Sequence, residues 1–264
     1  MKQKNDLVSV IVNCYNGEKF LKDCINSILN QTHHNLEIIF FDNNSSDKSE
    51  KIIKGYKDKR IKYYKSKKYL KLYNARNLAI EKANGKFIAF LDTDDWWDEK
   101  KLEKQLDVFS QNKEISFIYT NFFVYNQNTN KKIQIYKKLL PSGSITQVSL
   151  NKYEIGLLTV MIKRHVFNIK KFNEDYEIIG DFDFFISISQ KYKISSIEEP
   201  LAYYRVHSSN FSLKKINLHI EELERWIKLH EKDFLKKGYS LKKQKIVLIK
   251  LKIKHFFKKI INFD

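Results

Sequence analysis

Three carboxylates stand within four residues of this sequence, at Asp92, Asp94 and Asp95, directly after the apolar run 87–91. Carboxylates this close repel one another unless a cation or a hydrogen-bond donor offsets their charge. Such oxygen ligands suit Mg²⁺ or Mn²⁺, which proteins hold through one or two carboxylates together with substrate phosphates. The structural alternative is that Asp94 or Asp95 stabilises the start of a helix near Asp98. The position directly after a predicted strand favours the metal-binding interpretation.

A second polar cluster begins at Asp42, which ends the apolar run 37–41 and is followed by the polar residues 43–47. A carboxylate at the end of a strand can accept hydrogen bonds from ribose hydroxyls or from a base N–H. An Asx turn leading into a helix accounts for the same residues equally well. The sequence has no glycine-rich phosphate loop. A bound nucleotide diphosphate would therefore need cations, and Arg76 and a metal on Asp94 are the candidates.

Two further clusters lie later in the chain. The segment 180–184 places Asp181 and Asp183 among aromatic residues. Partial burial in such surroundings raises the pKa of a carboxyl group toward that of a working general base, although a helix start is the structural alternative. The segment 203–210 contains His207, and a lone histidine is more often structural than a ligand.

The elements that must position these clusters alternate between strands and helices. Apolar runs predict strands at 7–12, 37–41, 61–64 and 87–91. Helical spacing predicts helices over 20–29, 47–56 and 74–84. We expect Asn16 to cap the first helix, Asp47 and Glu50 to form a capping box on the second, and Gly85 to end the third.

This alternation predicts an α/β fold with a mostly parallel sheet covered by helices on both faces. Ligands bind beyond the carboxyl ends of the strands in such sheets. The clusters at 13–16, 42–47 and 92–95 should therefore face one crevice. Beyond residue 101 the pattern predicts a helix at 102–109, strands at 115–119 and 122–125, a turn at 126–132, a loop at 141–144, a helical segment at 184–188, an extended segment at 201–206 and helix from 213 onward.

The composition bounds the class of protein. The chain has 264 residues and a net charge of +18, from 49 basic and 31 acidic residues, which indicates an anionic partner. Two cysteines, Cys14 and Cys24, cannot form a disulfide framework and indicate a reducing compartment. No apolar stretch approaches the roughly 18–20 residues that cross a bilayer, and the apolar run at the amino terminus is too short for a signal peptide. We expect a cytoplasmic globular protein.

Four segments, taken in order, resemble glycosyltransferase family 2, the inverting enzymes of the GT-A fold. They are VSVIVNCYNGEKFLKDCINSILNQTHHNLEIIFFDNNSSDKS, NARNLAIEKANGKFIAFLDTDDWW, IGDFDFFISIS and YYRVHSSNFS. The resemblance covers roughly residues 7–212. Two departures are Asn13-Cys14, where members often have Pro-Thr, and Ser187, where many members carry Arg.

The resemblance implies roles for the residues at matching positions. The base and ribose of a nucleotide would contact Cys14, Tyr15, Asn16 and Asp42. The diphosphate would approach Arg76 and the DxD pair Asp92 and Asp94, with Asp95 close by. Asp94 would bind Mn²⁺ or Mg²⁺, with His207 near that metal. Asp181 would deprotonate the acceptor hydroxyl, and Asp183 would join the substrate-binding residues.

The function that follows from the resemblance is the inverting transfer of a sugar from a nucleotide-diphosphate sugar, with UDP the commonest nucleotide. The acceptor would be a saccharide or lipid-linked saccharide in the synthesis of bacterial polysaccharide, lipopolysaccharide or capsule. We expect a donor-binding half at 1–100, an acceptor-binding half at 101–212, and basic amphipathic helices at 213–264. A homodimer is left open.

The carboxyl-terminal segment supports two interpretations. Residues 241–264 contain eight Lys and one Asp, and an apolar stripe repeats at helical spacing: Ile246, Ile249, Ile253, Phe256, Phe257 and Ile260. This stripe could dock on an anionic membrane at the inner face of the cytoplasmic membrane, or pack on the domain or a second subunit.

The alternatives to an active transferase are a catalytically inactive relative and a basic module that binds a membrane surface or nucleic acid. Nucleic acid is disfavoured because carboxylates lining a crevice repel a phosphate backbone. A nucleotidyltransferase or a dehydrogenase would need the glycine-rich loop that is absent.

Overall fold

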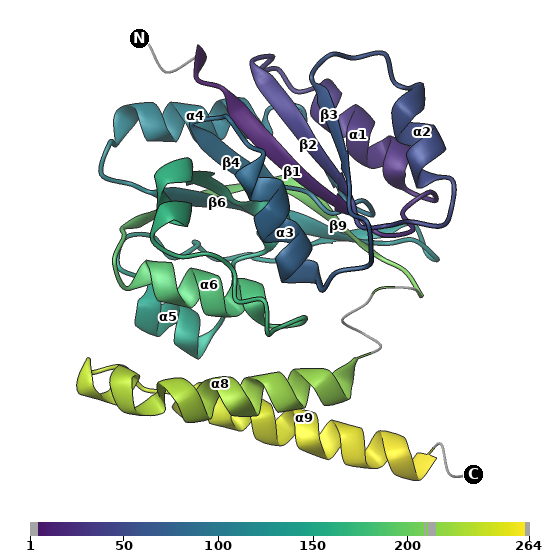
Figure 1. The fold of residues 1–264 in the computed structure, drawn as a ribbon. Helices are drawn as coiled ribbons and strands as arrows, with labels where there is room; N and C mark the ends of the chain where they lie inside the picture. Colours follow the sequence, from purple (N-terminus) through teal and green to yellow (C-terminus); the bar gives the residue numbers. More distant parts are fainter. Residues whose placement is uncertain (1–4, 209, 211–214, 262–264) are drawn as a thin grey trace.

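The computed structural model describes residues 5–208, 210 and 215–261. In this part of the chain one mixed sheet of nine strands runs in the order β3-β2-β1-β4-β8-β6-β9-β5, with β7 paired to β6 (Figure 1). The strands are β1 (Val8–Cys14), β2 (Leu36–Asp42), β3 (Ile61–Lys65), β4 (Phe87–Phe90), β5 (Trp96–Trp97), β6 (Phe117–Asn126), β7 (Lys131–Gln134), β8 (Met161–Lys163) and β9 (Ile194–Val206).

The first four strands, β3-β2-β1-β4, are parallel to one another, whereas β8 is antiparallel to both of its neighbours. The helices are α1 (Leu21–Leu29), α2 (Ser49–Gly55), α3 (Leu72–Glu81), α4 (Lys101–Gln111), α5 (Thr146–Asn151), α6 (Gly180–Ser189), α8 (Ile216–Lys236) and α9 (Lys242–Ile261), with short 3₁₀ helices η2 (Leu157–Thr159) and η3 (Arg164–Asn168). The predicted α/β class is confirmed.

Two hydrophobic cores lie on opposite faces of the sheet. Alternation along a strand sends successive side chains to opposite faces. In β1, Val10 and Val12 therefore pack on the face covered by α1, α2 and α4, whereas Ile11 packs on the face covered by α3, α5, α6 and α8. Nearly every residue of β1 and β2 is buried, which explains the continuous apolar runs in the sequence.

All three predicted helix ends are wrong, and in the first two the polar side chains involved make other hydrogen bonds or ion pairs. No side-chain cap precedes α1, and the Asn16 Oδ1 accepts a hydrogen bond from the Ser46 N–H instead. The Asp47 carboxylate accepts from Ser49 N and from Glu18 N, while Glu50 pairs with two lysines.

Gly85 serves close packing and does not terminate a helix. α3 ends at Glu81, with Lys82 as its cap, and so it stops well before Gly85. A Cβ atom on Gly85 would lie 2.6 Å from the Ser9 backbone nitrogen. Only glycine allows this segment to approach β1 so closely.

The chain after β9 forms a helical hairpin, here called the C-terminal hairpin, made of α8 and α9. The two helices lie side by side beneath α5 and α6 (Figure 1). The predicted helical run is interrupted by a turn at which Gly238 adopts a φ of 81°, a conformation suited to glycine. The predicted start at Leu213 and the Ile260 side chain lie outside the described residues. Within the described chain, no helix is both long enough and apolar enough to cross a membrane.

Candidate active site

A cavity of about 450 Å³, here called the strand-end cavity, lies beyond the carboxyl ends of β1, β2 and β4. Its walls include residues from all three strand ends, from α3 and from α6: Asn13, Tyr15, Asn43, Tyr73, Arg76, Asp92, Asp94 and Asp181. The sequence predicted one crevice shared by the three strand-end clusters, and each cluster contributes at least one residue to this cavity. The parallel arrangement of β2, β1 and β4 causes this convergence.

Asp94 faces two polar side chains that follow β9. Its Oδ2 atom lies 2.9 Å from His207 Nε2 and accepts a 3.3 Å hydrogen bond from Asn210 Nδ2. Asn210 Oδ1 in turn accepts from the His207 backbone N–H at 2.6 Å, so that the turn after β9 holds both groups against Asp94. The structure thereby joins two clusters that are more than a hundred residues apart in the sequence.

Arg205 holds the acidic loop, residues 92–95, in place. Its backbone N–H donates to Asp95 Oδ1 and its Nε donates to the Asp94 carbonyl, both at 2.8 Å. The guanidinium group lies over the rings of Phe20 and Trp96 at 4.4 and 4.5 Å. Asp95 is buried, and burial raises its pKa well above the usual range, helped by its two acidic neighbours. Asp95 therefore holds the loop against β9 and does not line the cavity. Sequence reasoning gave Arg205 no role, although this residue lies within the segment 203–210.

Arg76 is a buried residue that lines the strand-end cavity. Its guanidinium group lies over the rings of Tyr73 and Phe172, at 5.2 and 5.7 Å, and its Nη2 atom lies 3.1 Å from Asp92 Oδ1. The Asp92 side chain is 47% exposed, whereas that of Arg76 is 2% exposed. A fixed cation thus lies directly beside the acidic loop, at a place where an anionic group in the cavity would meet it.

Asp181 occupies the first turn of α6. Its Oδ1 accepts a 2.7 Å hydrogen bond from Phe182 N, and the Tyr73 hydroxyl lies 3.4 Å from the same oxygen. Burial raises the pKa of Asp181 to about 6, with hydrogen bonding and Arg76 acting in the opposite direction. The preceding residue has to be glycine, because a Cβ on Gly180 would lie 2.4 Å from the Tyr73 ring.

A second cavity, of about 490 Å³, meets the first at Asp181. We call it the hairpin cavity because α8 and α9 form one of its sides, and its lining includes Asp181, Phe182, His219, Leu223, Gln244 and Val247. Asp181 and Ile178 line both cavities, and Asp181 is the titratable one of the two. A carboxylate placed between two cavities, with a pKa near neutrality, can accept a proton from a group bound in one as it reacts with a group bound in the other.

Several predicted site residues do not line either cavity. Asp42 is fully buried, and its two carboxylate oxygens accept hydrogen bonds from Ser45 N and the Tyr63 hydroxyl, each at 2.8 Å. Cys14 is buried with its Sγ atom 3.8 Å from Ser45 Oγ, and Asn16 points toward Ser46 as described above. These three residues shape the loops that end β1 and β2.

Asp183 lies on the other side of α6 from Asp181. It accepts a 3.0 Å hydrogen bond from Trp226 Nε1 of α8, and Lys170 Nζ lies 3.1 Å from its second carboxylate oxygen. His230 Nε2, also from α8, lies 3.6 Å from Asp183. The structure therefore places Asp183 in the contact between α6 and the C-terminal hairpin. Residues two positions apart on a helix point to nearly opposite sides, so Asp183 faces away from Asp181.

Two contributors to the strand-end cavity were given no role from the sequence: Asn13, which belongs to the predicted cluster at 13–16, and Tyr69. The Asn13 amide is buried, and neither its nitrogen nor its oxygen has a hydrogen-bond partner among the described residues. Tyr69, from the loop before α3, lies edge-on to Tyr15 with ring centroids 4.7 Å apart, and about half of each side chain is exposed. The position of Asn13 at a strand end was a usable signal, whereas nothing in the sequence singles out Tyr69.

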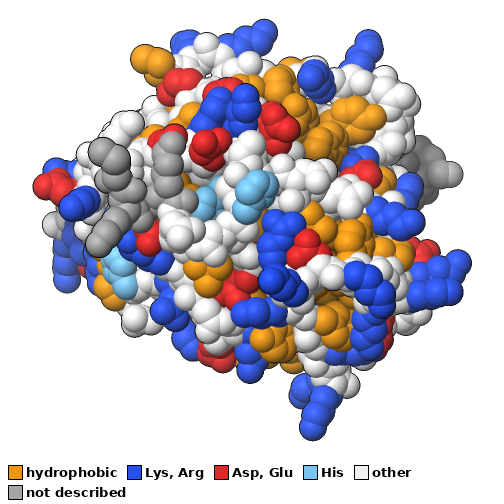
Figure 2. Space-filling model, turned by 90° about the horizontal axis from the view of Figure 1, so that it is seen from above, with side chains coloured by type: hydrophobic (Ala, Val, Ile, Leu, Met, Phe, Trp, Pro, Cys, Tyr) orange, Lys and Arg blue, Asp and Glu red, His pale blue; other side chains and the backbone are white. Residues whose placement is uncertain are grey.

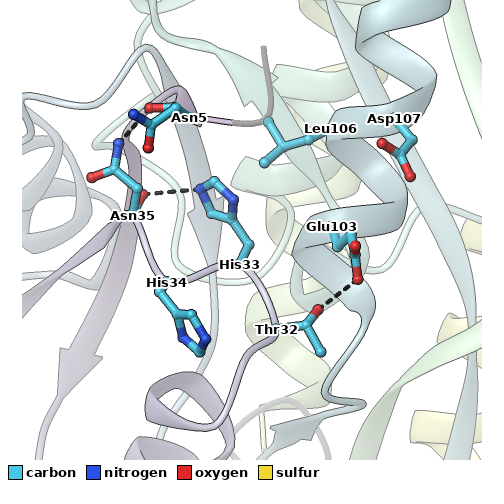
Figure 3. A pocket seen from close by; sticks show the side chains of 8 residues that line it. All are labelled: Asn5, Thr32, His33, His34, Asn35, Glu103, Leu106 and Asp107. Carbon is cyan, nitrogen blue, oxygen red and sulfur yellow. Dashed lines mark hydrogen bonds between the residues drawn. The ribbon is translucent and has the colours of Figure 1, made fainter. Parts of the chain in front are cut away.

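Another cavity, of about 300 Å³, lies at the amino ends of β1 and β2 (Figure 3). His33 Nε2 lies 3.0 Å from the carbonyl oxygens of both Asp6 and Asn35, and the Thr32 hydroxyl donates to Glu103 at 2.8 Å. The His33 ring and the Thr32 hydroxyl are thus already engaged within the protein. Over the described ranges, no group of three or more His, Cys, Asp or Glu residues could hold a metal, here or elsewhere. This cavity is therefore not the candidate site.

Solved structures with a similar fold bind nucleotide sugars. The chain superposes on 83% of its length with S. aureus TarS 1–349 in complex with UDP-GlcNAc, at a TM-score of 0.64 and 18% identity, covering 66% of that chain. It also resembles the mannosyltransferase PcManGT from Pyrobaculum calidifontis in complex with GDP-Man and Mn²⁺, at a TM-score of 0.62 and 15% identity, over 84% of this chain and 64% of that one. The fold is therefore of the GT-A type.

Sequence comparison identifies the family. Residues 9–189 match the model of glycosyl transferase family 2, and the chain belongs to this family. It is 35% identical over 212 residues to the Escherichia coli UDP-Glc:alpha-D-GlcNAc-diphosphoundecaprenol beta-1,3-glucosyltransferase WfgD, spanning 79% of this chain and 81% of that protein. It is 34% identical over 215 residues to the uncharacterized glycosyltransferase MJ1057 of Methanocaldococcus jannaschii, spanning 80% of this chain and 74% of that protein. The resemblance seen in the sequence is confirmed.

Proposed function

We propose that this glycosyltransferase transfers a sugar from a nucleotide-diphosphate sugar to a hydroxyl group with inversion, and that Asp181 is the general base. The observation that carries the proposal is the position of Asp181 between the strand-end cavity and the hairpin cavity. A donor in the first cavity and an acceptor in the second would meet at this carboxylate. Attack from the side opposite the leaving diphosphate inverts the anomeric carbon.

The donor fits the strand-end cavity by its chemistry. Tyr15 and Tyr69 offer an aromatic surface for a base, and the Asn13 amide of the same cavity, without a hydrogen-bond partner among the described residues, offers a donor and an acceptor. Arg76 offers a buried positive charge for the diphosphate. UDP is the nucleotide we favour, since the relative WfgD is named for UDP-Glc.

Asp94 and His207 are the residues that would hold a divalent metal. A carboxylate oxygen and an imidazole nitrogen 2.9 Å apart form a donor pair, and the diphosphate and water would complete the coordination of Mn²⁺ or Mg²⁺. The residues present fit such an ion. When bound, the metal would neutralise negative charge on the leaving diphosphate. Arg205 and Asn210 keep Asp94 and His207 together.

The acceptor that we propose is a lipid-linked saccharide used in the synthesis of a cell-surface polysaccharide. Two observations support this class: WfgD is named for a diphosphoundecaprenol acceptor, and a relative in Bacillus subtilis is named as a putative teichuronic acid biosynthesis glycosyltransferase. The division into a donor half at 1–100 and an acceptor half at 101–212 stays a proposal. The hairpin cavity adds α8 and α9 to the acceptor side.

Thermal shift and transfer assays on Asp94→Ala and Asp181→Asn test the assignment. A UDP-sugar at about 100 times its Kd should stabilise the native chain by roughly 2.7 kcal/mol in the presence of Mn²⁺. Asp94→Ala should lose this stabilisation. Asp181→Asn should keep it and lose transfer by roughly 10²–10⁴-fold. Normal turnover by Asp181→Asn would show that another group removes the acceptor proton.

A further inference from the structure

The outer side of α9 carries an exposed apolar stripe. Ile249, Ile253, Phe256 and Phe257 are 56%, 51%, 62% and 56% exposed, respectively. Their spacing of four, three and one residues places them on one side of a helix that turns by about 100° per residue. Large apolar side chains in a continuous exposed row mark an interaction surface more often than scattered ones do.

The opposite side of α9 already makes the contacts that hold the hairpin to the domain. Leu248 and Leu251 pack against the core that contains α8, and Gln244 Nε2 donates to the Leu150 carbonyl of α5 at 2.8 Å. Two ion pairs, Lys252–Glu224 and Lys245–Glu231, join α9 to α8. The domain therefore contacts the inner side of α9. The sequence left open whether the apolar stripe packs on the domain, and in the described residues its side chains are exposed instead.

Lysines border this stripe. α9 contains eight Lys and no acidic residue: Lys242, Lys243, Lys245, Lys250, Lys252, Lys254, Lys258 and Lys259. By helical geometry, Lys250 and Lys254 lie along one edge of the stripe, whereas Lys252, near the other edge, pairs with Glu224 of α8. On the opposite face of the molecule, seen in Figure 2, Lys and Arg are interspersed with Asp and Glu. What distinguishes α9 is that its positive charge is not interrupted by any acidic residue.

We propose that the outer side of α9 docks on an anionic lipid bilayer. The apolar row would enter the boundary between headgroups and acyl chains, while the bordering ammonium groups would lie at the level of the lipid phosphates. Each basic residue near such a surface contributes attraction that salt weakens. A second copy of this chain fits the face poorly, because two helices with eight Lys and no acidic residue would repel each other.

The position of α9 gives this docking a use that rests on the proposed function. Gln244 and Val247, in the first turns of α9, line the hairpin cavity that reaches Asp181. A membrane beneath α9 would therefore present a lipid-linked acceptor close to the cavity proposed to receive it. Docking itself does not depend on that assignment.

The experiment is co-sedimentation of the full chain with vesicles of phosphatidylglycerol and phosphatidylcholine, compared with phosphatidylcholine alone. We expect binding to the anionic vesicles only, reduced by high salt. The double variant Phe256→Ser, Phe257→Ser should bind at least roughly tenfold more weakly, because it loses the two aromatic side chains that would be buried in the bilayer. The charge-reversal variant Lys250→Glu, Lys254→Glu should also weaken vesicle binding, and this loss should be larger at low salt than at high salt.

The matched control is Ile133→Ser on β7, a side chain that is 62% exposed on a different part of the molecule. It should leave vesicle binding unchanged. Because both phenylalanines are exposed, the double variant should keep the thermal unfolding midpoint and the donor-dependent stabilisation of the native chain. Unchanged donor binding separates a failure of docking from a failure of the proposed function.

Two results would overturn the proposal. The first is equal sedimentation of the double variant and the native chain with anionic vesicles, or no sedimentation of either. The second is a dimer in sedimentation velocity that the double variant converts to a monomer, in a chain that does not bind vesicles. That result would assign the stripe to a second copy.

Discussion

Asp181 combines a partly buried position with hydrogen bonds that favour its ionised form. Burial dominates and raises its pKa to about 6, although Phe182 N and Arg76 act in the opposite direction. A carboxyl group with this pKa is ionised in most molecules at neutral pH, yet it is a stronger base than an ordinary aspartate. The close approach of Gly180 to the Tyr73 ring, which leaves no room for a Cβ atom, allows α6 to place Asp181 there.

The pH profile of transfer follows from this pKa. The proposed base works only when ionised, so kcat/KM should be constant above about pH 6 and fall about tenfold per pH unit below it. Measuring kcat/KM with a fixed donor, and donor binding by thermal shift over the same range, separates the base from pH effects on binding. The residual transfer of Asp181→Asn should lack the inflection. A native profile without an inflection near pH 6 would contradict the role given to Asp181.

At the scale of elements, β9 positions the acidic loop through Arg205. This side chain donates to Asp94, Gln127 and Asp23, and its guanidinium group is stacked between aromatic rings. A lysine has neither the planar fork nor the stacking surface that this arrangement uses. Arg205 thus ties β9 to the loop after β4 through both its backbone and its side chain.

Arg205→Lys should therefore lower the free energy of unfolding by about 2 kcal/mol and weaken Mn²⁺-dependent donor binding. Denaturant unfolding and donor titration with and without Mn²⁺ measure the two effects. The matched control is Arg60→Lys, which removes a guanidinium that pairs with the neighbouring Asp58. Equal losses of donor binding in both variants would show that Arg205 has no special part in holding the acidic loop.

The elements themselves were largely predictable, because buried parallel strands require continuous apolar runs. The runs that became β1, β2 and β4 and the polar residues after them follow from the sequence alone. The caps at Asn16 and Asp47 did not, because Ser46 and Glu18, from other segments, compete for the same groups. Asp42 was predicted at the right strand end. Its hydrogen bond to Tyr63 of β3 could not be predicted, because the two residues are far apart in the sequence.

At the scale of the whole molecule, the buried Asp183 carboxylate joins the C-terminal hairpin to α6. Trp226 is 1% exposed, and its Nε1 donates to Asp183. The same turn of α6 carries Asp181 toward the cavities and Asp183 toward α8. The hairpin is therefore seated directly behind the residue proposed as the base.

Trp226→Phe keeps an aromatic ring and removes the donor, so it should lower the free energy of unfolding by about 2 kcal/mol. Because the lost hydrogen bond joins the hairpin to α6, amide hydrogen exchange should rise more in α8 than in β1. Exchange mass spectrometry of the two segments measures this difference. An equal rise in both would mean that the hairpin and the sheet open together.

The two buried thiols offer a practical consequence for labelling. Cys14 and Cys24 are 1% and 0% exposed, and burial raises the pKa of both, so neither forms a reactive thiolate readily. The chain has only these two cysteines. A cysteine introduced in place of the exposed Ile253 would therefore take up a maleimide fluorophore selectively. The emission of that dye would report the polarity around α9 in a chain whose own thiols need no replacement.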